Sequence, residues 1–255
     1  MSAESVVIYE VEGGVARVTM NRPEKRNALN DELVAGLKSA LHRAHDDREI
    51  RVVILSGAGS DFCAGADLSA LQKIANASVA ENLDDARSLM ELFVLLREVR
   101  VPVIAAVRGR ALAGGCGLAL GCDLVIAEAE ARFGFPEVKI GFVPAMVMTI
   151  LRRNVSEKKA FELISLGGEI SAGEAASFGL INRAVDASSF DSEVKQLAAK
   201  LAALSPSAIT LSKQLLYKID SLSFAEALES GVDVNVTARM SDDCKKGIAR
   251  FLSRE

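Results

Sequence analysis

Two segments of small residues and one isolated carboxylate are the parts of this chain best suited to chemistry. The segments read FCAGADL at residues 62–68 and AGGCGLA at residues 113–119, and the carboxylate is Glu137 in FGFPE at residues 133–137. Small residues allow main-chain N–H groups to approach a bound carbonyl closely, and two such donors from distant segments would form an oxyanion hole for a thioester enolate. Glu137 would then transfer the proton.

The small-residue segments have other interpretations. Either could be a tight turn between a strand and a helix, which needs small residues for packing alone. Residues 57–62 (GAGSDF) resemble the start of a dinucleotide-binding fingerprint, but Phe62 stands where the third glycine would be. A phosphate-binding P-loop would need Gly-Lys-Ser or Gly-Lys-Thr, and neither segment continues that way. We therefore favour thioester chemistry over nucleotide binding.

Glu137 follows three apolar residues, Phe133, Phe135 and Pro136. Apolar surroundings would raise its pKa and suit it to proton transfer, although most glutamates are solvated. Asp67 is expected to cap the helix that follows it.

Cys63 and Cys116 lie within the two small-residue segments, which suggests a nucleophile. The only histidines, His42 and His45, lie on a predicted helix far upstream, so we expect buried thiols instead. No cluster of His, Cys, Asp and Glu has the spacing of metal ligands, so no catalytic metal is expected.

The composition fits one large α/β domain. The chain has 255 residues, of which half are apolar and 5% aromatic, so we expect an aliphatic core. The net charge of −4 gives no reason to expect nucleic acid or an anionic membrane as a partner. Four cysteines without a CxxC pair and a start without a signal-peptide pattern predict reduced thiols in the cytoplasm. No apolar run is long enough to span a membrane.

Strands, loops and helices alternate along the chain, which predicts an α/β fold with parallel strands and right-handed crossovers. In the first part we expect a hairpin at 6–9 and 15–20, a helix capped by Asn30 that runs to about Arg48, a strand at 51–55, a glycine-rich loop at 56–67 and a helix at 81–99. We then expect a strand at 103–107, a short helix through Leu118, a strand at 124–127 and helices at 156–165, 171–179, 205–217, 224–239 and 242–252.

Five blocks in this order resemble the enoyl-CoA hydratase/isomerase (crotonase) family. They are NRPEKRNAL at 21–29, FCAGADL at 62–68, ALAGGCGLALGCDL at 111–124, FGFPEVKIGFVP at 133–144 and GGEISAGEAASFGLINRAV at 167–185. The resemblance implies a spiral of ββα units at residues 1–190, which would bind and convert an acyl-CoA. It also implies a C-terminal helical subdomain at residues 191–255, which would cover the pocket and form a homotrimer or homohexamer.

The resemblance also implies a set of site residues. The oxyanion donors would be the N–H groups of Ala66 and Gly114, and Glu137 would be the acid or base. Lys25 and Arg26, which form a basic cluster with Arg22, would bind the 3′-phosphate end of coenzyme A. Further substrate-binding residues would be Ala28, Ala64, Gly65, Asp67, Leu68, Gly115, Pro136 and Gly141. Coenzyme A would be part of the substrate, and no separate cofactor is expected.

Two departures from the family pattern bear on the reaction. The family's hydratases usually carry a second catalytic glutamate where this chain has Gly117, and glycines often stand where it has AMVM at 145–148, so we expect a reshaped acyl pocket. Moving a double bond needs only one carboxylate, whereas hydration ordinarily uses two. Because some hydratases of the family share the glycine, we favour an enoyl-CoA hydratase of fatty or branched acyl metabolism. A 3-enoyl-CoA to 2-enoyl-CoA isomerase and a non-catalytic acyl-CoA-binding protein are the alternatives. We expect a glutamate at position 117 to be tolerated unless the helix there is tightly packed.

Overall fold

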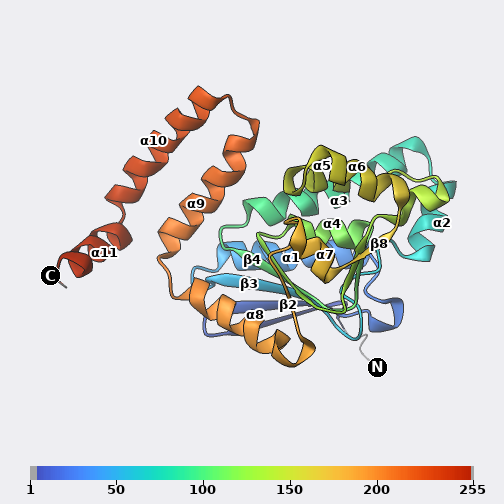
Figure 1. The fold of residues 1–255 in the computed structure, drawn as a ribbon, viewed down its shortest axis with the longest axis horizontal. Helices are drawn as coiled ribbons and strands as arrows, with labels where there is room; N and C mark the ends of the chain where they lie inside the picture. Colours follow the sequence, from blue (N-terminus) through green and yellow to red (C-terminus); the bar gives the residue numbers. More distant parts are fainter. Residues whose placement is uncertain (1–4, 254–255) are drawn as a thin grey trace.

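The computed structural model describes residues 5–253 and contains two sheets with helices on both faces of the larger one (Figure 1). The large sheet has the order β1-β2-β3-β4-β6-β9. Its strands are β1 (Val7–Glu12), β2 (Val15–Met20), β3 (Val52–Gly57), β4 (Val103–Val107), β6 (Leu124–Glu128) and β9 (Arg183–Val185). All neighbouring pairs are parallel except β1 and β2, which form the expected hairpin around Gly13 and Gly14.

A second, three-stranded sheet has the order β5-β7-β8. Its strands are β5 (Arg110–Leu112), β7 (Arg132–Gly134) and β8 (Glu169–Ser171). Strands β4 and β6 of the large sheet each lead into a strand of the small sheet, and a helical turn follows each pair. This arrangement is the ββα repeat that the family resemblance implies. Periodicity alone missed these three strands, because three residues are too few to show alternation.

The helices described below are bounded as follows. They are α1 (Asp31–Asp46), α2 (Leu68–Asn76), α3 (Val79–Glu98), α4 (Gly114–Gly121), α5 (Ala145–Asn154), α6 (Glu157–Leu166), α7 (Ala172–Ser177), α8 (Ala187–Ala202), α9 (Pro206–Lys218), α10 (Phe224–Met240) and α11 (Asp242–Leu252). Three short 3₁₀ turns are η1 (Pro23–Lys25), η2 (Pro136–Ile140) and η3 (Ile219–Ser221). The expected cap of α1 is confirmed, since the Asn30 side chain accepts from Leu33 N.

Strand β3 shows why the fold has two cores. Val53 and Leu55 point into the main core with residues of α1, α3 and α4, while Val52 and Ile54 point to the opposite face. There they pack with Phe190 and other residues of α8. A strand buried on both faces is typical of parallel sheets covered by helices on both sides, and it explains the uninterrupted apolar run VVIL.

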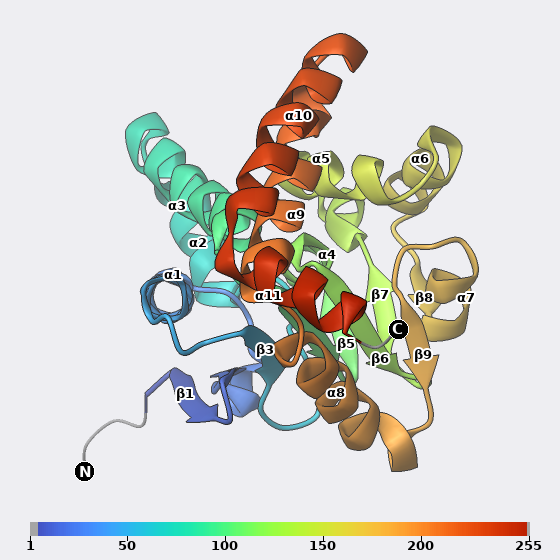
Figure 2. The same ribbon diagram turned by 90° about the vertical axis from the view of Figure 1, so that its left-hand side faces the viewer.

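The last three helices, α9–α11, form an arm that extends away from the sheet (Figures 1 and 2). A buried ion pair anchors the arm, because Lys213 Nζ on α9 donates to Asp123 Oδ2 over 2.7 Å and to the carbonyls of Leu96 and Val101. The hydroxyl of Tyr217 donates to Asp123 Oδ1 over 2.7 Å. The C-terminal helices predicted from the sequence are confirmed at residues 206–252.

Helices α2, α5 and α8 and strand β9 were not predicted. The glycine-rich loop at 56–67 ends in α2, and α8 occupies a stretch for which no element was expected. The predicted boundary between residues 190 and 191 falls inside α8, which packs on the sheet through Phe190, Val194 and Ala198. A boundary between core and C-terminal subdomain that falls after α8 would keep this helix with the sheet on which it packs. Among the described residues, no helix has both the length and the apolar character needed to cross a bilayer.

Candidate active site

The two small-residue segments lie side by side and are hydrogen-bonded to each other. Cys63 N donates to the Arg110 carbonyl over 2.9 Å, and Leu112 N donates to the Cys63 carbonyl over 3.0 Å. The first segment therefore runs parallel to β5, which leads directly into the second segment. The expectation that these two segments, which are distant along the chain, lie together in the fold is confirmed.

Two glycines make this close approach possible. A Cβ at Gly65, where φ is +100°, would lie 3.1 Å from Ala113 Cβ and 3.2 Å from the Leu112 carbonyl oxygen. A Cβ at Gly115 would lie 2.7 Å from Cys63 Sγ. Both glycines are therefore required by the contact between the segments, whatever else they do.

The backbone N–H of Ala66 points away from its neighbouring segment. Leu29 N donates to the Gly65 carbonyl over 2.7 Å, and Asp67 N donates to the Leu29 carbonyl over 2.9 Å. In this parallel pairing Leu29 bonds to both neighbours of Ala66, so the N–H of Ala66 faces the opposite side. It has no acceptor among residues 5–253, and Ala66 is exposed.

Gly114 opens α4, and its N–H is likewise without an acceptor in the described chain. The preceding residue, Ala113, has φ 50° and ψ −124°, a conformation that residues with a side chain rarely adopt. This conformation sets the direction of the Gly114 N–H. Ala113 is held there because its own N–H donates to the Gly134 carbonyl over 2.9 Å.

Glu137 lies in η2, three residues after Gly134, and is 8% exposed. Its carboxylate oxygen Oε2 is buried and finds no hydrogen-bond partner among the described residues. Burial raises its pKa above the ordinary glutamate value, as the sequence predicted. Gly141 ends η2 in the left-handed conformation, which lets Phe142 N donate to the Glu137 carbonyl over 3.0 Å.

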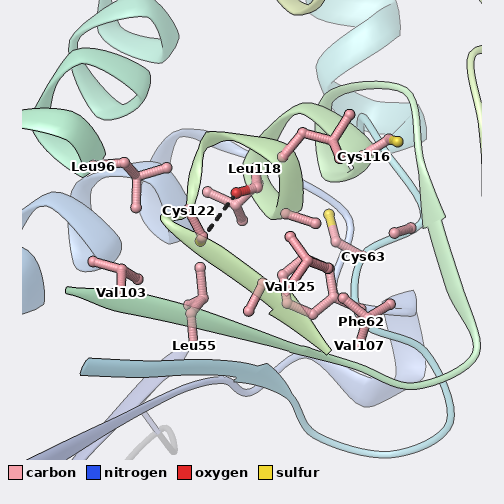
Figure 3. Close-up of a cluster of buried hydrophobic side chains, with 14 of the residues drawn as sticks. Leu55, Phe62, Cys63, Leu96, Val103, Val107, Cys116, Leu118, Cys122 and Val125 are labelled. Carbon is pink, nitrogen blue, oxygen red and sulfur yellow. Dashed lines mark hydrogen bonds between the residues drawn. The ribbon is translucent and has the colours of Figure 1, made fainter. Parts of the chain in front are cut away.

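The cysteines beside the donors are buried (Figure 3). Burial raises the pKa of the Cys63 thiol to about 12 and raises the pKa of Cys116 further. The Glu137 carboxylate contributes to the shift of the Cys116 pKa, which places Glu137 near α4. The prediction of buried thiols is confirmed, and the raised pKa values disfavour the thiolate that a nucleophile needs. Within residues 5–253 no three metal-binding side chains converge.

The remaining predicted residues fall into two groups. Ala28, Ala64, Asp67 and Pro136 are buried or half-buried near the paired segments, and the backbone of Leu68 begins α2. The side chains of Lys25 and Arg26 are exposed, and neither forms an ion pair with another described residue. Asp67 caps α2 as predicted, since its side chain accepts from Ser69 N over 3.0 Å.

Gly117 lies inside α4, and its side-chain position is already filled. A Cβ there would stand 2.7 Å from Val147 Cγ2 and 3.2 Å from Phe93 Cζ, and both of these residues are buried. Val147 comes from the AMVM segment that was expected to reshape the pocket. A glutamate was expected to be tolerated here only if the packing were loose, and the packing is tight, so the substitution should cost stability.

Arg22 was grouped with Lys25 and Arg26 as one basic cluster, but the structure separates it from them. Its guanidinium turns inward and pairs with Asp67 at 2.7 Å. The sequence carried no signal for this pairing, since the two residues are distant along the chain and each has a common surface role.

A twisted sheet of ββα units whose loops present two acceptor-free N–H groups and one buried carboxylate defines an acyl-thioester enzyme of the crotonase class. The model of the enoyl-CoA hydratase/isomerase family matches residues 10–255, and the chain belongs to this family.

The similarity to relatives and to solved structures extends over nearly the whole chain. A Thermus thermophilus protein, provisionally named as an enoyl-CoA hydratase, is 40% identical to this chain, and the alignment covers 95% of this chain and 96% of the relative. The short-chain-enoyl-CoA hydratase of Clostridium acetobutylicum is 35% identical, and the alignment covers 97% of this chain and 95% of the relative. A crystal structure of an enoyl-CoA hydratase from Mycobacterium smegmatis has a TM-score of 0.95 at 30% identity, and covers 99% of this chain and 98% of that one.

Proposed function

We propose that this enzyme is an enoyl-CoA hydratase that binds the thioester carbonyl of a 2-enoyl-CoA between the N–H groups of Ala66 and Gly114. The observation that carries the proposal is the pair of acceptor-free N–H groups on two hydrogen-bonded loops beside a buried carboxylate. The names of the similar proteins support the same reaction.

The proposed mechanism gives each group a role. As water adds to the β-carbon, negative charge develops on the thioester oxygen, and the two N–H donors stabilise the resulting enolate. Losing one such donor typically raises the barrier by about 3–4 kcal/mol. Glu137 delivers its proton to the α-carbon and takes up the proton that the added water gives up, so the carboxyl group is restored. Its raised pKa favours the protonated form needed for the first of these transfers. No cofactor beyond the coenzyme A of the substrate takes part.

A second candidate is a 3-enoyl-CoA to 2-enoyl-CoA isomerase. The observation that favours it is the apolar contact of Val147 and Phe93 at Gly117, which leaves Glu137 as the one carboxylate assigned to the site. Isomerisation removes a proton from the α-carbon and returns one to the γ-carbon, so a single carboxylate suffices.

One experiment separates the candidates. The enzyme is incubated with 2-enoyl-, 3-enoyl- and 3-hydroxyacyl-CoA thioesters in ¹⁸O-labelled water, and the products are analysed by mass spectrometry. Label in a 3-hydroxyacyl product supports the hydratase. A shifted double bond without label supports the isomerase, and tight binding without turnover supports a non-catalytic acyl-CoA-binding protein.

We assign Lys25 and Arg26 to the phosphates of coenzyme A, because both side chains are exposed and available at the start of the segment that pairs with the Ala66 loop. Reversing both charges to glutamate should raise KM for CoA thioesters much more than for pantetheine thioesters, which lack the 3′-phosphate. The effect should weaken at high salt. Equal losses for both substrates would make the cluster structural.

We also assign a homotrimer or homohexamer in a reducing compartment such as the cytoplasm. The arm presents exposed apolar side chains that a partner would cover, among them Phe224, Leu228, Val232 and Met240. The four cysteines are free, which suits a reducing compartment. Light scattering should give three or six times the 27.1 kDa of one chain, and a mass equal to one chain at micromolar concentration would refute the assembly.

A further inference from the structure

Arg22 connects the loop that carries Ala66 to the segment that supports it. Its side chain is 12% exposed, and Nη2 donates to Asp67 Oδ2 over 2.7 Å. Nη1 of the same guanidinium donates to the carbonyl of Ala28. One planar group therefore bonds to both sides of the pairing between Leu29 and Ala66.

Asp67 directly follows the donor and is held from several sides. Its N–H donates to the Leu29 carbonyl over 2.9 Å, and Oδ1 accepts from the N–H and hydroxyl of Ser69. The Arg22 guanidinium at Oδ2 lowers the pKa of Asp67 to about 2, so the carboxylate stays ionised at neutral pH. The Asp67 side chain is 7% exposed, so without Arg22 a nearly buried charge would lose its counter-ion.

The segment around Arg22 is itself fixed. Arg22 N donates to Asn27 Oδ1 over 2.9 Å, and Asn27 Nδ2 donates to the carbonyls of Ala58 and Asp61. Asn27 is fully buried and has a positive φ, so its backbone is constrained by these contacts. Arg22 therefore acts from a rigid base.

We infer that Arg22 is a positioning residue for the oxyanion hole, which fixes the direction of the Ala66 N–H through its simultaneous bonds to Asp67 and to the Ala28 carbonyl. The inference rests on the proposed function, because it assumes that the Ala66 N–H binds the thioester oxygen. Arg22 itself does not touch the substrate. Without Arg22, both Asp67 and the Ala28–Leu29 peptide would lose a hydrogen-bond partner. The N–H of that peptide donates to the Gly65 carbonyl over 2.7 Å, so the Gly65–Ala66 peptide, which carries the Ala66 N–H, would turn as well.

A lysine at position 22 distinguishes positioning from simple charge balance. Its ammonium can lie beside Asp67, but it lacks the planar guanidinium that donates to the Asp67 carboxylate and to the Ala28 carbonyl at the same time. Arg22→Lys should therefore keep most of the stability of the protein but lose part of the orientation of the Ala66 N–H. Arg22→Met should lose both stability and that orientation. A matched control is Arg183→Gln, which removes a surface ion pair with Glu193 (3.1 Å) on β9, at the far edge of the large sheet.

The test uses a cinnamoyl-CoA with an electron-donating para substituent, whose absorption moves to longer wavelength when its thioester carbonyl is polarised. The full-length wild type and Arg183→Gln should give the same red shift. Arg22→Met should lose most of it, and Arg22→Lys should keep part of it. Turnover of Arg22→Met should fall by about 10²-fold, as expected when a catalytic group is displaced by about 1 Å, while KM changes far less.

A full red shift and wild-type turnover in folded Arg22→Met would overturn the inference. If Arg22→Met does not fold, Asp67→Asn and Arg22→Lys decide, and a full red shift in both would overturn it equally. The absence of any red shift in the wild type would instead contradict the proposed function, so the two failures can be told apart.

Discussion

The contact at Gly117 gives a prediction whose size follows from the structure. In Gly117→Ala the new Cβ would stand 2.7 Å from Val147 Cγ2, whereas carbon atoms pack best at about 3.5–4.0 Å. Overpacking of this kind destabilises by about 1–3 kcal/mol, and replacing a helical glycine by alanine returns about 1 kcal/mol. We therefore expect Gly117→Ala to be less stable than wild type by about 0–2 kcal/mol.

When Val147 is truncated to alanine, Gly117→Ala should stabilise the protein instead of destabilising it. Val147→Ala alone removes two buried methyl groups and leaves a cavity, which should destabilise by about 2–3 kcal/mol. In the double variant the methyl group introduced at position 117 occupies the space that Val147 Cγ2 vacated. The two changes should therefore be coupled favourably by about 1–3 kcal/mol, the size of the overpacking that is relieved.

Urea unfolding of the four proteins measures this coupling, provided that the denaturant slope stays constant across the set. A Gly117→Ala variant that is about 1 kcal/mol more stable than wild type would show that the space beside Gly117 is open. Additivity within about 0.5 kcal/mol would contradict the contact with Val147. If the contact is present, Gly117→Glu alone should be strongly destabilised, and a glutamate can enter only together with truncation of Val147.

Two further predictions concern buried charges. Lys213→Met should destabilise the protein by about 3–5 kcal/mol and speed hydrogen exchange in α9, because it removes the cation from Asp123 and the donor from two carbonyls; unchanged exchange would show that the arm is anchored elsewhere. Glu137→Gln should stabilise the protein at pH 8 but not at pH 4. The folded-state pKa of Glu137 is raised, so ionising it disfavours the folded state only above the unfolded value of about 4.3. A stability difference that is equal at both pH values would contradict the raised pKa.

The sequence predicted those features that local patterns determine. The strand at Val103–Val107 and the helix at Asp242–Leu252 lie where their apolar spacing and caps placed them. The small sheet was missed because its strands have three residues each. Helix α8 was also missed, although its buried residues Phe190, Val194 and Ala198 recur at helical spacing.

The candidate site shows the same division between local and long-range information. The motifs predicted the two small-residue segments and an apolar flank for Glu137, and the family resemblance assigned Ala66 and Gly114 as the donors and Glu137 as the acid or base. The pairing of Arg22 with Asp67 and the contact of Val147 with Gly117 join residues that are remote along the chain. Such contacts depend on how the loops and helices pack, which no local pattern of this sequence encodes.

The central claim is that one buried carboxylate, Glu137, transfers the proton while two backbone N–H groups hold the thioester oxygen. The most direct test compares Glu137→Gln with wild type, measuring turnover of the preferred enoyl-CoA and the red shift of the bound cinnamoyl-CoA on the same protein. The account predicts that turnover falls by roughly 10²–10⁴-fold while the red shift is retained, because the amide removes proton transfer and leaves the donors in place. Wild-type turnover with unchanged products in Glu137→Gln would contradict it and assign the proton transfer to another group.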